Sequence, residues 1–136
     1  MEIRILDRKE SVKEIKKLIY YAKEELIIIS PYIDIKDDYK EELEKCRAKD
    51  KLIVFREGQF LKDYKLLKSL KFHLMEVKDL HAKIYMNENY VLFSSMNLYR
   101  YSMENNHETS IMVKREYLSD KDLNILFKIA EYGRMV

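Results

Sequence analysis

Short apolar runs of strand length alternate with segments of helical periodicity along almost the whole chain. The run from Leu26 to Ile29 is one leucine followed by three isoleucines, which is typical of a strand buried on both faces. The segment after Asp7 repeats apolar side chains at helical spacing, and Asp7 with Glu10 forms a capping-box pattern at its start. Because strands that alternate with helices fold into layers around a sheet, this pattern predicts an α/β domain.

The same criteria give the bounds of all the predicted elements. The predicted strands are Ile3–Leu6, Leu26–Ile29, Leu52–Phe55, Phe72–Val77, Ala82–Met86, Tyr90–Phe93 and Thr109–Val113. The predicted helices run from Asp7 to Lys23, from Asp37 to Lys49, from Leu61 to Leu70 and from Asp120 to Tyr132, the last one capped near Ser119. We expect these elements to form a mixed, mostly parallel β-sheet flanked by helices on both faces.

Length and composition indicate a single domain of residues 1–136 with its own core. Hydrophobic residues make up 47% and charged residues 37%, as in a soluble globular protein, and no apolar run approaches the roughly 18 residues that cross a bilayer. The start, Met1 to Asp7, has no signal-peptide pattern, and the single cysteine, Cys46, fits a reducing compartment. We therefore expect a cytoplasmic protein without a membrane anchor.

The residue types that are scarce limit the cofactors. Gly58 and Gly133 are the two glycines of the chain, too few for a P-loop or a Gly-rich dinucleotide turn, so ATP and NAD are not expected. The three histidines and one cysteine show no familiar zinc-ligand spacing. We expect no metal and no cofactor, with a carboxylate-bound magnesium ion the one option left open.

Groups suited to phosphodiester chemistry gather around the predicted strand Ala82–Met86. If this strand forms, its alternation places His81, Lys83 and Tyr85 on one face, with the intervening apolar residues toward the core. A potential nucleophile and a cation are then side by side.

The next extended run, Tyr90–Phe93, is followed by Ser95 and Asn97 at the same two-residue spacing. A turn over Asn87–Asn89 makes the two runs an antiparallel hairpin, so we expect these polar side chains at the same end of the hairpin as His81 and Lys83.

This segment resembles the signature of the phospholipase D superfamily, which reads His-x-Lys, then Asp, then Gly-Ser and Asn. Here His81-x-Lys83 is followed by Glu88, Ser94-Ser95 and Asn97, so Glu88 stands where the family has Asp and Ser94 where it has Gly. The interval between these two positions is also one residue shorter than in the family. Residues 22–33 resemble the family's opening helix and strand, and 106–108 resemble a segment downstream of its signature.

The resemblance implies a role for each matching residue. His81 matches the nucleophile that forms a covalent phosphohistidine. Lys83 and Asn97 match the groups that bind the non-bridging phosphate oxygens and stabilise the transition state, and Ser95 matches a hydroxyl that supports the phosphate. Glu108 matches a carboxylate that hydrogen-bonds the imidazole and sets its tautomer.

The family mechanism uses two histidines, one as nucleophile and one as general acid, whereas this chain has one His-x-Lys. The resemblance therefore implies a homodimer whose two-fold axis passes through the active site. The expected function is metal-independent cleavage of nucleic-acid phosphodiester bonds. The alternatives are a phospholipid phosphodiesterase, and a catalytically weak nucleic-acid-binding or assembly module that retains the fold.

The net charge of +2 is too small to establish a polyanionic partner by itself. The stretch from Phe60 to Lys78 carries five lysines against two acidic residues, shortly before His81. It is interpreted either as a basic rim beside the site or as a solvated helix face.

Overall fold

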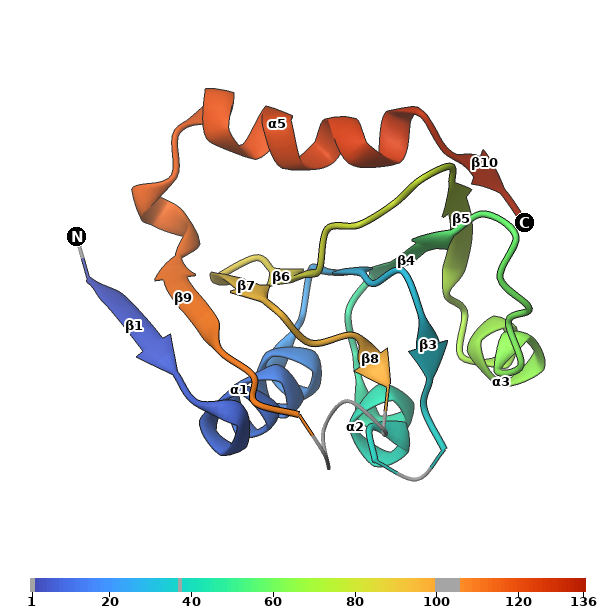
Figure 1. Cartoon of the computed structure of the whole chain (residues 1–136), viewed down its shortest axis with the longest axis horizontal. Coiled ribbons are helices and arrows are strands. Elements are labelled where there is room, and N and C mark those ends of the chain that lie inside the picture. The colour runs from blue at the N-terminus through green and yellow to red at the C-terminus, as the bar shows by residue number, and fades with distance from the viewer. Residues whose placement is uncertain (1, 37, 100–105) are drawn as a thin grey trace.

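The computed structural model describes residues 2–36, 38–99 and 106–136 (Figure 1). The helices are α1 (Arg8–Tyr21), α2 (Lys40–Lys45), α3 (Tyr64–Ser69), the 3-10 turn η1 (Arg115–Tyr117) and α5 (Asp120–Glu131). The strands are β1 (Ile3–Leu6), β2 (Glu25–Ile29), β3 (Ile33–Asp34), β4 (Asp50–Arg56), β5 (His73–Val77), β6 (Ile84–Asn87), β7 (Tyr90–Ser94), β8 (Leu98–Tyr99), β9 (Ser110–Lys114) and β10 (Arg134–Met135).

Among the described residues, eight strands form one mixed sheet in the order β1-β9-β7-β6-β2-β4-β5-β10, and β3 pairs with β8 in a separate two-stranded ribbon. In Figure 1 the sheet lies between α5 on one side and α1, α2 and α3 on the other. The predicted α/β fold with helices on both faces is therefore confirmed.

The directions of the strands differ in one respect from the prediction of a mostly parallel sheet. Within the described sheet, β2 with β4 and β4 with β5 are the parallel neighbours, whereas the other neighbouring pairs are antiparallel. The reason is that β6 and β7 form a hairpin, which needs only a tight turn, while β9 and β10 return antiparallel along their neighbours.

The core has one part on each face of the sheet. On one face, Ile28 and Tyr85 join side chains of α1, α2 and α3, while on the other face Ile29, Ile84 and Met86 join Leu126 of α5. Consecutive residues of β2 thus enter different parts of the core, which confirms the prediction that this strand is buried on both faces.

The predicted capping box at Asp7 and the predicted cap at Ser119 are both present, and the second is also a capping box. At the start of α1 the Asp7 side chain accepts from the Glu10 backbone N–H, and the Asp7 backbone N–H donates to the Glu10 carboxylate. Ser119 and Asp122 exchange the same two hydrogen bonds at the start of α5. Since a capping box satisfies two N–H groups that the helix leaves unpaired, the starts of these helices were predictable from local sequence.

Two predicted helices are shorter in the structure. The helix predicted from Asp37 to Lys49 is observed only over Lys40–Lys45, and Asp37 lies outside the described residues. It ends early because the backbone N–H groups of Lys49 and Asp50 donate to the carbonyls of Lys23 and Glu24, which brings this part of the chain into the sheet.

The helix predicted from Leu61 to Leu70 is Tyr64–Ser69, and Lys71 ends it with a φ of 70°. The two-residue strands β3, β8 and β10 were not predicted, because so short a strand leaves no periodic signal.

Within the described residues, no helix has both the length and the apolar character needed to cross a membrane.

Candidate active site

Strand register brings the predicted site residues to one edge of the sheet. The start of β6 lies between the ends of β2 and β7, since Ile84 pairs with both Ile29 and Phe93. The end of β7 in turn lies beside the start of β9, where Ser94 pairs with Ser110. Residues just before β6 and β9 and just after β7 therefore meet at this edge, which we call the catalytic edge because the residues predicted to be catalytic lie on it. It is also the edge at which the parallel strands β2, β4 and β5 end, the usual place for a ligand in an α/β sheet.

His81 and Lys83 reach the catalytic edge from the loop between β5 and β6. The loop is held by Arg56, whose Nη1 donates to the Leu80 carbonyl at 3.2 Å, and by burial of the Leu80 side chain. His81 is exposed and Lys83 is half-buried, and neither side chain has a hydrogen-bond or ion-pair partner among the described residues. Both side chains are thus available to a ligand.

The strand begins later than the sequence predicted, at Ile84 and not at Ala82. Tyr85 does not share an open face with His81 and Lys83: it is fully buried, and its hydroxyl donates to the Met96 carbonyl at 2.8 Å. The predicted alternation failed because β6 is covered on both faces. His81 and Lys83 therefore depend on the loop, not on the pleat of the strand, for their positions.

Ser95 and Glu108 form a hydrogen-bonded pair at the same edge. The Ser95 hydroxyl donates to Glu108 Oε2 at 3.1 Å and accepts from the Thr109 backbone N–H at 3.1 Å. Its backbone N–H donates to the Thr109 carbonyl at 3.1 Å. The observed partner of the Glu108 carboxylate is thus Ser95, and the contact with His81 that the family resemblance implies stays a prediction.

Asn97 ties the end of the hairpin to the turn after β2. Its Oδ1 accepts from the Ser30 hydroxyl at 3.4 Å and from the Tyr32 backbone N–H at 3.3 Å. Ser30 is fully buried and also accepts from the Leu98 backbone N–H at 2.9 Å. With its oxygen engaged in this way, Asn97 keeps its amide N–H groups for a ligand. Sequence analysis missed Ser30, and the signal was a polar residue directly after a fully apolar strand.

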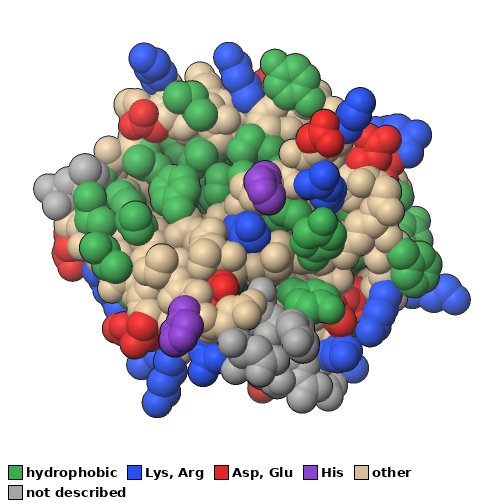
Figure 2. All heavy atoms as spheres, in the orientation of Figure 1, with side chains coloured by type: hydrophobic (Ala, Val, Ile, Leu, Met, Phe, Trp, Pro, Cys, Tyr) green, Lys and Arg blue, Asp and Glu red, His purple; other side chains and the backbone are tan. Residues whose placement is uncertain are grey.

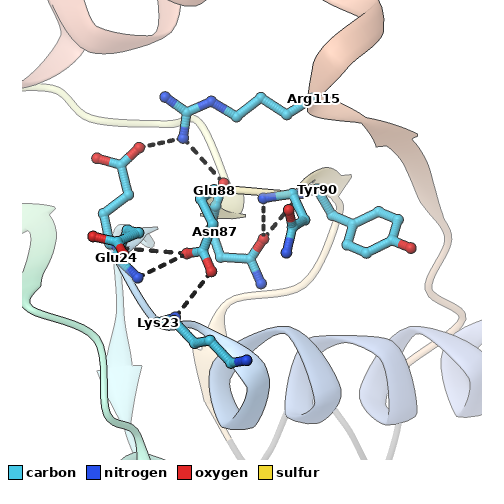
Figure 3. A network of polar contacts seen from close by, with 8 residues as sticks. Lys23, Glu24, Asn87, Glu88, Tyr90 and Arg115 are labelled. Carbon is cyan, nitrogen blue, oxygen red and sulfur yellow. Dashed lines mark hydrogen bonds and ion pairs between the residues drawn. The ribbon is translucent and has the colours of Figure 1, made fainter.

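Glu88 lies at the opposite edge of the sheet, where it closes the turn between α1 and β2 (Figure 3). Its carboxylate accepts from the backbone N–H groups of Lys23, Glu24 and Glu25, at 2.9, 3.2 and 3.3 Å. Burial raises the pKa of the Glu88 carboxyl, but these backbone donors lower it by more, so that the pKa lies below its ordinary value. Glu88 is a structural residue: its side chain, one methylene longer than the aspartate of the family signature, stabilises a turn far from the catalytic edge.

Asn87 and Arg115 complete this region of Figure 3. Asn87 Nδ2 donates to the Leu18 carbonyl at 2.9 Å, while its Oδ1 accepts from the backbone N–H groups of Asn89 and Tyr90 at 2.8 and 2.9 Å. Arg115 pairs with Glu25 and donates to the Asn87 carbonyl. The predicted Asn87–Asn89 turn is confirmed, and its conformation is set by a buried side chain.

Ser94, which replaces a family glycine, causes no backbone strain. Its φ is not positive, and its hydroxyl accepts from the Met96 backbone N–H at 2.9 Å and from the Ser110 hydroxyl at 2.8 Å. A side chain is therefore accommodated here, and its hydroxyl fixes the turn that leads from β7 to Asn97.

The surface at the catalytic edge carries a shallow hollow. This hollow of about 370 Å³ is lined by Asp7, Arg8, Lys9, Asn106, His107 and Glu108. Figure 2 shows one face of the molecule, on which a histidine lies near the centre with basic side chains beside it, and hydrophobic side chains gather between α5 and the β1–β9 edge. A larger hollow of about 640 Å³ lies elsewhere, between α1 and α2, so size does not mark the predicted site.

The lysines between Phe60 and Lys78 do not all lie at this edge. Lys78 follows the end of β5 and so lies on the catalytic side, but Lys71 precedes the start of β5 at the opposite edge. Lys62 pairs with Asp34 at 3.5 Å. The run spans the sheet from edge to edge and does not form a continuous rim.

Comparison with solved structures identifies the fold. Nuc from Salmonella typhimurium, a phospholipase D family member, superposes with a TM-score of 0.80 at 16% identity over 99% of each chain. NucT from Helicobacter pylori gives 0.78 at 14% identity, again over 99% of both chains. Phosphatidylserine synthase from Haemophilus influenzae Rd KW20 gives 0.77 at 14% identity over 98% of this chain and 40% of the other.

A scan against protein-family models and a search of curated proteins gave no match. The chain thus has the fold of phospholipase D family members, and the resemblance seen in its sequence is confirmed at the level of the fold.

Proposed function

We propose that this protein is a metal-independent phosphodiesterase that cleaves nucleic-acid phosphodiester bonds with His81 as nucleophile. The observation that carries the proposal is the gathering of His81, Lys83, Ser95, Asn97 and Glu108 at one edge of a fold shared with Nuc. These residues come from three separate loops, and an unengaged imidazole and ammonium lie beside amide and hydroxyl groups. Such a set suits attack on a phosphate and stabilisation of its oxygens.

The proposed reaction has two displacements. An imidazole nitrogen of His81 attacks phosphorus, the bond to the leaving oxygen breaks, and a second imidazolium gives that oxygen its proton. Water then attacks the phosphohistidine, loses a proton to the second imidazole, and the phosphorus–nitrogen bond breaks to restore His81. Lys83 and the amide of Asn97 hold the non-bridging oxygens, while Glu108, positioned by Ser95, balances the charge on an imidazolium.

The second imidazole is proposed to come from His81 of another copy in a homodimer. An exposed apolar patch beside the catalytic edge supports this: Ile5 and Ile111 pair across β1 and β9 and are 75% and 44% exposed, and Ile3 is 52% exposed. Figure 2 shows hydrophobic side chains gathered over this part of the surface. Contiguous exposed apolar residues of this kind mark interaction sites. Two copies joined here place their catalytic edges close together.

A phospholipid is the alternative substrate, since phosphatidylserine synthase shares this fold. The departures from the family signature at Glu88 and Ser94 are the argument for a catalytically weak module. Glu88, however, supports the α1–β2 junction far from the catalytic edge, and the Ser94 hydroxyl supports the turn that leads to Asn97. We therefore favour the enzyme over the module. We favour nucleic acid over lipid because Nuc and NucT match this chain over 99% of their length, and phosphatidylserine synthase over 40% of its length.

Cleavage in excess EDTA tests this function. Labelled single-stranded DNA, duplex DNA, RNA, phospholipid vesicles and a bis-aryl phosphate are each incubated with the wild type and with His81→Ala. We expect nucleic-acid cleavage by the wild type and loss of at least about 10³-fold in the variant. His73→Ala is the matched control, because His73 is an exposed histidine at the start of β5 on the other edge. A dimer that cleaves only lipid, or nothing, contradicts the proposal.

A further inference from the structure

We infer that the outer face of α1 and the groove at its C-terminal end form a second binding site, which holds single-stranded nucleic acid leading away from the catalytic edge. The cleavage of that strand rests on the proposed function, whereas its binding does not. The site comprises a row of lysines along α1 and two tyrosines at the far end of the helix, beside α2.

The outer face of α1 is basic. Ser11, Ile15, Leu18 and Ile19 are on its buried side, whereas Lys9, Lys13, Lys16 and Tyr20 recur at spacings of three and four residues on the other side. At about 100° per residue these four side chains lie within an arc of about 60°. They therefore form one row along the helix.

The acidic residues of α1 do not neutralise this row. Glu10 belongs to the capping box, and Glu14 is buried against Arg4 and Lys17, at 3.5 and 4.0 Å. Lys9, Lys13 and Lys16 have no hydrogen-bond or ion-pair partner among the described residues, and Glu41 of α2, the carboxylate near Lys16, is paired with Lys45. A row of unpaired cations beside engaged carboxylates attracts a polyanion.

The row ends at two exposed aromatic rings. Tyr20 and Tyr21 are 46% and 59% exposed, and their rings meet edge to face, with centroids 4.9 Å apart and an interplanar angle of 84°. In this arrangement the two rings cannot stack on each other, so ring surface remains for another flat group. Exposed tyrosines amid cations are the components of a stacking platform for unpaired bases.

A groove of suitable size adjoins these rings. It has a volume of about 640 Å³ and is lined by Tyr20, Tyr21, Ala22, Lys23, Glu44, Lys45, Cys46 and Arg47. This volume lies within the range of small-ligand sites. Lys45 is engaged by Glu41 at 2.8 Å, but Lys23 and Arg47 have no side-chain partner among the described residues. The groove thus places two cations, which have no partner in the described part of the chain, and the one carboxylate of Glu44 beside two rings, and its charge is net positive even with Lys45 and Glu41 paired.

The start of α1 connects this groove to the catalytic edge. Asp7, Arg8 and Lys9 line the hollow that also includes His107 and Glu108. The helix has 14 residues and so is about 21 Å long, which is the length of several nucleotides of a single strand. A strand along the lysine row can therefore reach both sites. Because stacking needs unpaired bases, the site selects single-stranded nucleic acid over duplex.

Binding is measured with the full chain carrying His81→Ala, so that no turnover interferes. The probe is a fluorescent oligothymidine long enough to span α1, with the same sequence as a duplex for comparison. We expect Tyr20→Ala to weaken binding of the single strand about tenfold and Tyr20→Phe to retain it, because phenylalanine keeps the stacking surface. Lys13→Glu with Lys16→Glu should weaken binding and lower its salt dependence.

The matched controls are on α3, where Tyr64 is 40% exposed and Lys65 and Lys68 follow it. Tyr64→Ala, and Lys65→Glu with Lys68→Glu, should leave binding unchanged. Equal losses from the α1 and α3 variants, or no loss from Tyr20→Ala, overturn the inference. The inference is also overturned if the α1 residues bind anionic phospholipid vesicles and do not bind the oligonucleotide.

The second site and the proposed function can fail separately. In proteins that retain His81, Tyr20→Ala should slow cleavage of a long single strand while leaving turnover of a bis-aryl phosphate unchanged, because that small ester cannot reach the groove. Cleavage without the α1-dependent binding removes this inference and leaves the function standing. Binding through α1 without cleavage by any variant contradicts the proposed function and leaves this inference standing.

Discussion

At the scale of single residues, the hydrogen bond between Ser95 and Glu108 fixes the position of one carboxylate of the proposed site. Ser95 Oγ both donates to Glu108 and accepts from the Thr109 backbone, which fixes the carboxylate relative to β9. A carboxylate held in place can orient an imidazole and balance its charge, as it does in the Ser-His-Asp hydrolases. Glu108 is therefore the residue whose charge, more than its shape, should matter.

Glu108→Gln tests that role, because the amide keeps an oxygen that can accept from Ser95 but has no charge. We expect the cleavage rate to fall between about tenfold and 10⁴-fold with little change in thermal stability. Ser95→Ala should give a smaller loss, since it frees the carboxylate without removing it. Full activity of Glu108→Gln in a folded dimer contradicts the role assigned to Glu108.

At the scale of elements, the junction between α1 and β2 depends on a side chain from a different hairpin. Glu88 receives three backbone N–H groups that neither the helix nor the strand satisfies, and it lies 65 residues from Lys23 in sequence. Hydrogen bonds to a charged acceptor stabilise more than neutral ones. The α1–β2 junction and the β6–β7 hairpin should thus be coupled in unfolding.

Glu88→Gln should lower the free energy of unfolding at pH 7 by about 1–3 kcal/mol. Because the folded pKa of Glu88 is lowered, its contribution is present above the ordinary glutamate pKa and is lost as the pH falls through the lowered value. The difference between wild type and variant should therefore shrink on acidification.

Urea unfolding over a series of pH values measures this difference, with Glu2→Gln as the control at an exposed glutamate. A difference that stays constant down to about pH 2, below the ordinary glutamate value, contradicts the role of the Glu88 charge.

At the scale of the whole molecule, the catalytic edge carries one His81 imidazole and lies beside an apolar patch. If two copies share one site, each dimer needs two intact histidines. A mixed dimer of wild type and His81→Ala has one, so it can supply a nucleophile or a general acid but not both.

Titration of the wild type with His81→Ala should therefore reduce activity per wild-type chain toward zero as mixed dimers form. His81→Ala combined with Ile5→Glu is the control, since a buried charge at the apolar patch should keep the variant out of the dimer. If the activity per wild-type chain stays unchanged while sedimentation detects mixed dimers, each copy is active alone and the shared active site is contradicted.

Local pattern was sufficient for those parts of the fold whose physical cause is local. The apolar run of β2, the capping boxes at Asp7 and Ser119, and the Asn87–Asn89 turn depend on residues within a few positions of one another, and all of them are present. The residues of the candidate site were also selected by local motif, because the spacing of His81 and Lys83 and of Ser95 and Asn97 can be seen in the chain.

Long-range pairing decided the rest. Asn97 accepts a hydrogen bond from Ser30, which lies 67 residues away in sequence. The helix predicted to reach Lys49 ends early because the backbone there bonds to Lys23 and Glu24 of a distant segment. Periodicity along a sequence cannot report which backbone groups will meet, so neither the shortened α2 nor the burial of both faces of β6 could be predicted. The row of lysines on α1 becomes a candidate site only through the fold, which places one end of it at the catalytic edge and the other beside α2.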